Sequence, residues 1–165
     1  MKVLGIDPGI AILGWSILEK NGNRIQCLDF GVLESAAHTP LTERLCIIYN
    51  DLKELLEEHR PDVIALETLF FVKNAKTLAL VGHARGVILL LAGQYKCEVQ
   101  EYAPKQIKMA LTGSGAAEKR QMQLMVQRML NLKSIPQPDD AADAVAVGLC
   151  HLQFSRVNTK VSATI

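Results

Sequence analysis

The order of strand-like and helix-like segments constrains the fold of this chain more than any other sequence feature. Apolar β-type runs cover residues 3–6 and 12–18, and the dipeptide Asn21-Gly22 is a strong signal for a type I′ hairpin leading into a strand at 24–33. Two later strands, 63–66 and 98–102, are separated by helix-like stretches. A hairpin followed by helix-flanked strands predicts an α/β fold, a mixed five-stranded sheet with helices on both faces.

Helical spacing fills most of the remaining chain. Leucines and isoleucines recur every three or four residues from Leu41 to Leu55, after Thr39 as expected N-cap and Pro40 at the first helical position. Further helices are expected at residues 74–93, 104–111, 117–131 and 139–154. We therefore expect one domain over residues 1–154 and a flexible tail over 155–165, where periodicity is lost.

Length and composition limit the class of protein. With 165 residues and 49% hydrophobic content, the chain suffices for one well-buried core. The N-terminus lacks a basic and apolar leader, and no uninterrupted apolar run reaches about 18 residues, so we expect a soluble, cytoplasmic protein without membrane contact. The four cysteines include no C-x-x-C pair, which favours reduced, mainly buried thiols over a zinc site.

Four carboxylates stand where apolar segments begin or end. Asp7 follows the first strand, Glu67 closes the strand at 63–66, and Asp140 and Asp143 share one face of the last helix. Gathered carboxylates repel one another unless cations neutralise them, and hard oxygen ligands select Mg²⁺ or Mn²⁺. Taken singly, three of them have an ordinary alternative: a turn at Asp7, a solvated strand end at Glu67 and helix-dipole decoration at Asp140. Asp143 is harder to dismiss, because it lies among apolar residues of the helix and a buried acid needs a partner.

Basic residues are concentrated in one segment. Residues 104–133 carry six lysines and arginines, among them Lys105, Lys108, Lys119 and Arg120, against the single acid Glu118. Such a segment in a chain of net charge +1 is typical of a surface that contacts phosphates, although lysines also serve solubility.

These motifs together resemble one family. The matching stretches are residues 5–9 (GIDPG), 64–67 (IALE) with Phe70, 82–86 (GHARG), 101–108, 113–119 (GSGAAEK) and 140–144 (DAADA). In this order they resemble the RuvC-type Holliday junction resolvases, crossover junction endodeoxyribonucleases of the ribonuclease H-like superfamily. The resemblance spans residues 1 to about 151.

The resemblance implies a homodimeric, Mg²⁺-dependent nuclease that cuts opposed strands of a four-way DNA junction symmetrically, in recombination and repair, and leaves 5′-phosphates. Asp7, Glu67, Asp140 and Asp143 fall on the family's catalytic acids, and we expect them to hold two Mg²⁺ ions, which Mn²⁺ can replace. It also implies a branch-migration helicase complex of the RuvA and RuvB type as partner.

The same resemblance assigns roles outside the acids. Lys108 and Lys119 fall on basic positions near the cleaved strand, and Phe70 on an aromatic that meets unpaired bases. Gly82 and Gly86 fall in a dimer interface, although an internal helix-packing groove is an alternative. Asp139 adds a fifth acid where relatives often have a small or neutral residue; N-capping is the simplest explanation, and competition as a metal ligand the other.

Three other functions are consistent with parts of the pattern. An RNA-acting nuclease would share the fold and the acids. A sugar-kinase or actin-like ATPase also opens with a Gly-x-Asp-x-Gly turn, but needs two lobes to enclose ATP. A catalytically silent junction-binding module is disfavoured by the four intact carboxylates.

Overall fold

The chain folds around a five-stranded mixed sheet. The computed structural model describes residues 1–36, 38–68 and 75–161, with the side chains of 155–161 left aside. The strands are β1 (Lys2–Asp7), β2 (Ile12–Asn21), β3 (Arg24–Glu34), β4 (Val63–Glu67) and β5 (Glu98–Tyr102), in the spatial order β3-β2-β1-β4-β5. The β1–β2 and β2–β3 pairs are antiparallel, whereas β4 is parallel to both β1 and β5.

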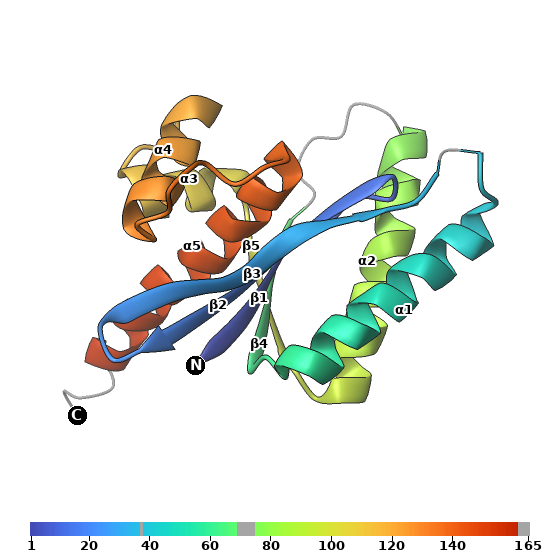
Figure 1. Cartoon of the computed structure of the whole chain (residues 1–165), viewed down its shortest axis with the longest axis horizontal. Coiled ribbons are helices and arrows are strands. Elements are labelled where there is room, and N and C mark those ends of the chain that lie inside the picture. Colours follow the sequence, from blue (N-terminus) through green and yellow to red (C-terminus); the bar gives the residue numbers. More distant parts are fainter. Residues whose placement is uncertain (37, 69–74, 162–165) are drawn as a thin grey trace.

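Helices cover both faces of this sheet (Figure 1). Helices α1 (Leu41–His59) and α2 (Ala75–Tyr95) pack together on one face. Helix α5 (Asp139–Val161) crosses the other face over β1 and β2, and α3 (Pro104–Thr112) and α4 (Lys119–Met129) pack against α5. The predicted α/β class, with a mixed five-stranded sheet between helical layers, is confirmed.

Each face of the sheet has its own apolar core. On the α1–α2 side, large aliphatic side chains such as Ile48, Leu52 and Ile88 pack on Leu4 and Ile64 from the strands. On the α5 side the core combines alanine and valine with larger residues such as Leu18 and Tyr102, and the buried positions of that helix include Ala141 and Val145. Because strand side chains alternate in direction, successive residues of β1 supply the two cores in turn.

The local structure departs from the sequence predictions at three element ends. Asn21 pairs with Arg24, so the turn residues are Gly22 and Asn23; the positive φ of 60° at Gly22 alone fits type II′ rather than the expected type I′. Helix α1 begins after Pro40, which itself occupies the N-cap, so Thr39 does not. Helix α5 continues to Val161, past the end expected near Phe154.

The expectation of mainly buried cysteines needs correction. All four cysteines are free thiols, but only Cys150 is buried, and Cys46 is exposed on α1. Helix α2 is long and apolar enough to span a membrane by length and composition, with a window of mean hydropathy 1.4, although Lys76 and Arg85 interrupt its apolar residues. One side of this helix belongs to the α1–α2 core, through Ala84, Ile88 and Leu91.

Candidate active site

Two of the four predicted acids meet because their strands are parallel neighbours. Ile6 of β1 pairs with Leu66 of β4, so Asp7 and Glu67 leave the sheet side by side at the carboxyl ends of these strands. Helix α5 begins over the same end, and its first turns carry Asp140 and Asp143. The sheet register and one helix thus bring together residues from three distant parts of the sequence.

Helix α5 lies almost backbone to backbone on β1 and β2. A Cβ atom on Gly14, the residue paired with Asp7, would lie 2.0 Å from the carbonyl oxygen of Asp140. A Cβ on Gly5 would lie 2.4 Å from the carbonyl oxygen of Ala144. Such distances exclude any side chain without a shift of the helix, so these glycines set how near α5 comes to Asp7.

A buried hydroxyl ties the helix to the sheet at the same place. Ser16 of β2 is fully buried, and its Oγ donates a hydrogen bond of 3.0 Å to the carbonyl oxygen of Ala144. Ala144 directly follows Asp143 in α5. The sequence prediction did not include Ser16, although its position among apolar residues of a buried strand is the signal that marks it.

The gathered acids make the site electrostatically unfavourable without a cation. Burial, together with the charges of Asp143 and Asp140, raises the pKa of Asp7 to about 7, and Lys119 opposes the shift. Burial, together with the charges of Asp7 and Asp143, likewise raises the pKa of Glu67 to about 7, and Lys108 opposes it. The pKa of Asp143 is also raised, mainly by burial, despite the nearby Lys119.

A cavity of about 250 Å³ opens beside these acids. Glu67 and Asp143 supply its acidic wall, and Lys108 and Lys119 its basic wall; the remaining lining residues are Pro104, Ile107, Met122 and Ala146. Such a cavity suits a phosphate group. The lysines can contact the phosphate directly, and the carboxylates can contact it through bound cations.

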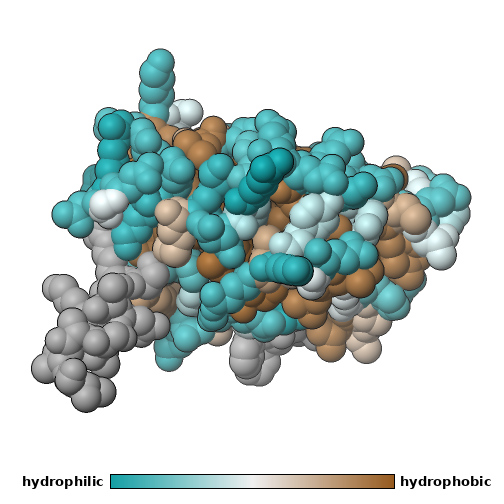
Figure 2. Space-filling model, turned by 90° about the horizontal axis from the view of Figure 1, so that it is seen from below, coloured by the Kyte–Doolittle hydropathy of each residue, from teal (hydrophilic) through white to brown (hydrophobic). Residues whose placement is uncertain are grey.

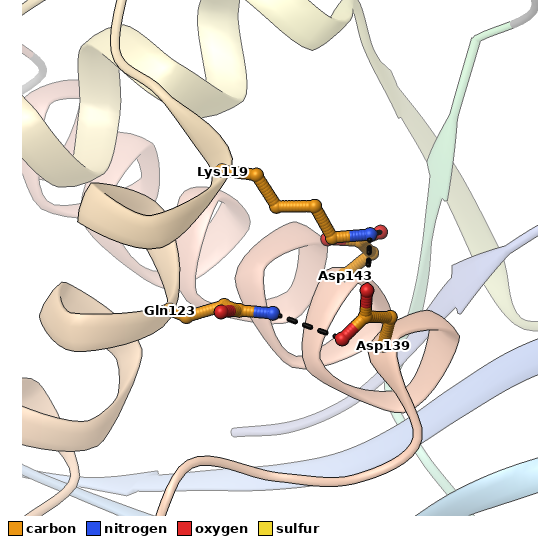
Figure 3. A network of polar contacts seen from close by, with 4 residues as sticks. All are labelled: Lys119, Gln123, Asp139 and Asp143. Atoms are coloured by element: carbon orange, nitrogen blue, oxygen red, sulfur yellow. Dashed lines mark hydrogen bonds and ion pairs between the residues drawn. The ribbon is translucent and has the colours of Figure 1, made fainter.

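Lys119 lies between two carboxylates at the start of α4 (Figure 3). Its Nζ is 3.1 Å from Oδ2 of Asp139 and 3.2 Å from Oδ2 of Asp143. Gln123 completes the network, since its Nε2 donates a hydrogen bond of 3.0 Å to Oδ1 of Asp139. The carboxylate of Asp139, expected as a helix cap, is thus hydrogen-bonded to two side chains of α4 instead.

The residues present fit a divalent cation by their chemistry. The metal-binding atoms would be carboxylate oxygens, which Mg²⁺ prefers. The pKa values of Asp7 and Glu67 are raised to about 7 because the site lacks positive charge, and a bound cation would supply that charge. In the part of the chain that the structure describes, no three His, Cys, Asp or Glu side chains are gathered closely enough to form a ready-made metal site.

The other predicted site residues lie apart from this cavity or are not placed. Lys105 and Arg120 are exposed, and neither lines the cavity with Lys108 and Lys119. Gly82 and Gly86 lie on α2, where a Cβ on either would meet open space, so they are not an internal packing groove. Phe70 lies outside the described residues.

Two histidines on the helices make packing or local backbone contacts. His151 is buried on α5, and its Nδ1 is 2.8 Å from the hydroxyl of Tyr102, whose ring stacks on Phe154. The backbone of Tyr102 pairs with Glu67 and accepts a hydrogen bond of 2.9 Å from the N–H of Thr68, which extends the β4–β5 pairing past Glu67. His83 is exposed on α2, with its Nδ1 2.6 Å from the carbonyl oxygen of Ala79.

Comparison with known proteins gives a consistent family. The model of the family "Crossover junction endodeoxyribonuclease RuvC" matches residues 3–151. The protein of that name from Thermomicrobium roseum is 50% identical over 156 residues, 94% of this chain and 95% of the relative. The structure of T. thermophilus RuvC in complex with a Holliday junction substrate superposes with a TM-score of 0.92 at 36% identity, covering 96% of this chain and 97% of that one.

A more distant structure has the same fold at low sequence identity. The yeast mitochondrial Holliday junction resolvase Ydc2 is only 15% identical, yet it superposes with a TM-score of 0.67 over 99% of this chain and 84% of its own. That likeness concerns the fold alone. The near full-length family match and the close identity to curated members show that this chain belongs to the RuvC family of crossover junction endodeoxyribonucleases.

Proposed function

We propose that this protein is a structure-selective endodeoxyribonuclease that resolves Holliday junctions by hydrolysing phosphodiester bonds in two opposed strands. One observation carries the proposal: Asp7, Glu67, Asp140 and Asp143 converge at one end of the sheet beside a cavity that also receives Lys108 and Lys119. Relatives of this chain are named for cutting crossover junctions, and a structural relative at 36% identity was solved with a Holliday junction substrate.

We further propose that the acids hold two Mg²⁺ ions, for which Mn²⁺ substitutes. When bound, such ions neutralise the non-bridging phosphate oxygens, lower the pKa of the attacking water and relieve charge on the leaving oxygen. Asp7 would take part in holding the ions together with the other acids, since the charges of Asp140 and Asp143 both act on it and its own charge acts on Glu67. Asp140 orients the attacking water or supplies a further ligand.

The lysines of the cavity contact the substrate's phosphates. Lys119 holds the scissile phosphate and stabilises its developing negative charge, while Lys108, beside Glu67, positions a neighbouring phosphate. The exposed Lys105 and Arg120 extend this basic surface along the strand. Phe70, which follows Glu67 in sequence, stacks on an unpaired base at the crossover, and the products carry 5′-phosphates and 3′-hydroxyls.

A second copy of the chain is needed to cut both strands symmetrically. Gly82 and Gly86 on α2 allow close approach of another backbone, and Leu78, Leu89 and Leu90 on the same helix are exposed. Figure 2 shows apolar side chains lying open among polar ones on the side of the molecule where α1 and α2 lie. A homodimer through α2 covers this surface and places two sites in one particle, matching the two-fold symmetry of a four-way junction.

Two further expectations complete the proposal. The enzyme acts in the cytoplasm, where reduced cysteines are stable. Its junction is delivered by a branch-migration helicase complex of the RuvA and RuvB type, as the family membership implies.

The test is a cleavage assay on three synthetic substrates: a four-way junction, a matched duplex and an RNA–DNA hybrid, each with and without Mg²⁺. We expect Mg²⁺-dependent paired nicks in the junction alone. Asp7→Asn and Glu67→Gln should abolish cleavage while junction binding, measured with Ca²⁺ in place of Mg²⁺, stays equal or tightens. Preferred cleavage of the hybrid would instead indicate an RNA-acting nuclease, and normal cleavage by either variant would refute the site.

A further inference from the structure

The Lys119 ammonium forms ion pairs with Asp143 and Asp139, and only Asp143 is expected to bind the cation. Asp143 lines the cavity with Glu67 and acts electrostatically on Asp7, so it is a ligand in the proposed site. Asp139 is exposed and is not among the four acids of the site. A cation that takes the carboxylate of Asp143 competes with Lys119 for it and repels the ammonium. Asp139, whose Oδ2 is 3.1 Å from Nζ of Lys119, is then the carboxylate that still pairs with Lys119.

Gln123 determines which oxygen of Asp139 is available for this contact. Gln123 and Lys119 are four residues apart on α4, so both side chains project from one helix face toward the start of α5. The amide of Gln123 donates to Oδ1 of Asp139, and Oδ2 faces Lys119 (Figure 3). A carboxylate fixed in this way is a directed anchor for a side chain that otherwise has many rotamers.

We propose that Asp139 is a positioning residue that keeps Lys119 beside the cavity after a cation has taken Asp143, with Gln123 orienting Asp139. Lys119 is thereby already in place when the scissile phosphate enters, and the freedom of its long side chain is lost before the reaction. Asp139 acts through Lys119 and touches neither cation nor DNA. This inference rests on the proposed role of Lys119 at the phosphate.

A double-mutant cycle tests whether Asp139 acts through Lys119. Single-turnover junction cleavage is measured at saturating Mg²⁺ for the unmodified enzyme, Asp139→Ala, Lys119→Ala and the double variant. We expect Asp139→Ala to slow cleavage about tenfold when Lys119 is present and less than about twofold when it is absent, because contacting residues couple. Equal losses in both backgrounds, or no loss in the first, would overturn the proposal.

Companion variants separate positioning from other roles. Asp139→Glu, which retains a carboxylate, should restore part of the lost rate, and Gln123→Ala should lose less than Asp139→Ala. Glu58→Ala on α1 removes an exposed acid elsewhere and should cleave normally. The Mg²⁺ concentration for half-maximal cleavage should change less than about twofold in Asp139→Ala; a tenfold rise would make Asp139 a metal ligand instead.

A measurement without cleavage keeps this inference distinct from the proposed function. NMR relaxation of the lysine side chains in protein with Mg²⁺ and no DNA should show Lys119 restricted, and more mobile in Asp139→Ala. Lys53, whose exposed ion pair with Glu57 spans 3.7 Å, is the reference for a mobile lysine. Mobility of Lys119 equal to that of Lys53 in the unmodified protein would refute the anchor. Restricted Lys119 without junction cleavage would instead refute only the proposed function.

Discussion

The two faces of the sheet are packed in different ways, and the difference explains where the acids come together. On the α5 side, Gly5, Gly14 and Ser16 let a helix backbone contact the strands directly, which fixes Asp140 and Asp143 beside Asp7. On the α1–α2 side, large aliphatic side chains separate helices from sheet. Side chains in that core can repack around a substitution, whereas a direct backbone contact has no side chain that could adjust. The site is built on the face where position is most closely determined.

The largest expected contrast comes from one substitution on each face. Gly14→Ala forces α5 away from Asp7, since a Cβ would lie 2.0 Å from the carbonyl oxygen of Asp140, and a shift of about 1 Å can reduce the rate on the order of a hundredfold. Ile88→Ala in the other core should cost about 2–5 kcal/mol in the free energy of unfolding, yet leave the cleavage rate per folded molecule near normal. Cleavage kinetics and urea unfolding of both variants check this.

Circular dichroism provides the control for Gly14→Ala, because the comparison requires a folded variant. A folded Gly14→Ala enzyme that cleaves at the normal rate would show that the seat of α5 does not set the geometry of the acids.

The second prediction concerns the pH dependence of stability without metal. The pKa values of Asp7 and Glu67 are raised from 3.8 and 4.5 to about 7, so the folded state binds more protons than the unfolded state. Their stabilising contribution is full below about pH 4 and is lost as pH rises through about 7, on the order of 3–4 kcal/mol for each acid. The melting temperature in EDTA should therefore fall between pH 5 and pH 8.

Asp7→Asn isolates this effect, because it removes one titrating acid and also removes the charge that most raises the pKa of Glu67. The variant should melt at a higher temperature than the unmodified protein at pH 8, with a flatter pH dependence. A melting temperature that rises with pH in both proteins would contradict the raised pKa values. Added Mg²⁺ should restore the stability of the unmodified protein at pH 8.

Ser16→Ala should have a smaller effect on the α5 face. The substitution removes the hydrogen bond to the carbonyl oxygen of Ala144 and should cost about 1 kcal/mol in the free energy of unfolding. Ser16→Cys, which retains a weak donor, should lie between Ser16→Ala and the unmodified protein. Chemical denaturation measures both; no loss in Ser16→Ala would show that the glycine contacts alone seat the helix.

The smallest stability effect is expected at the exposed face of α2. Leu90 is 55% exposed, so Leu90→Ser should change the free energy of unfolding of the monomer by less than about 0.5 kcal/mol. In the proposed dimer the same residue is covered, and the variant should dissociate at higher protein concentration. Analytical ultracentrifugation measures the dissociation of both proteins. An unmodified protein that remains monomeric at micromolar concentration and is fully active would rule out the α2 dimer.

The amino-acid sequence by itself determined the elements, their order and the identity of the acids. Secondary structure depends on local signals: the alternation of side chains in strands, the spacing of leucines in helices, and Gly or Pro at element ends. These signals extend over only a few residues, so helices and strands were predicted to within a few residues of their bounds. Errors were confined to such ends, where competing local conformations differ little: the turn at Gly22, the start of α1 and the end of α5.

Only the tertiary structure decided which residues meet. The pairing of β1 with β4 places Glu67 beside Asp7, and contact of α5 with Gly14 brings Asp140 there, across more than a hundred residues of sequence. The anchor from Asp139 to Lys119 depends on how α4 rests on α5. No local pattern encodes these distances, because they follow from the packing of whole elements around two cores, and the raised pKa values of the acids exist only once that packing has formed.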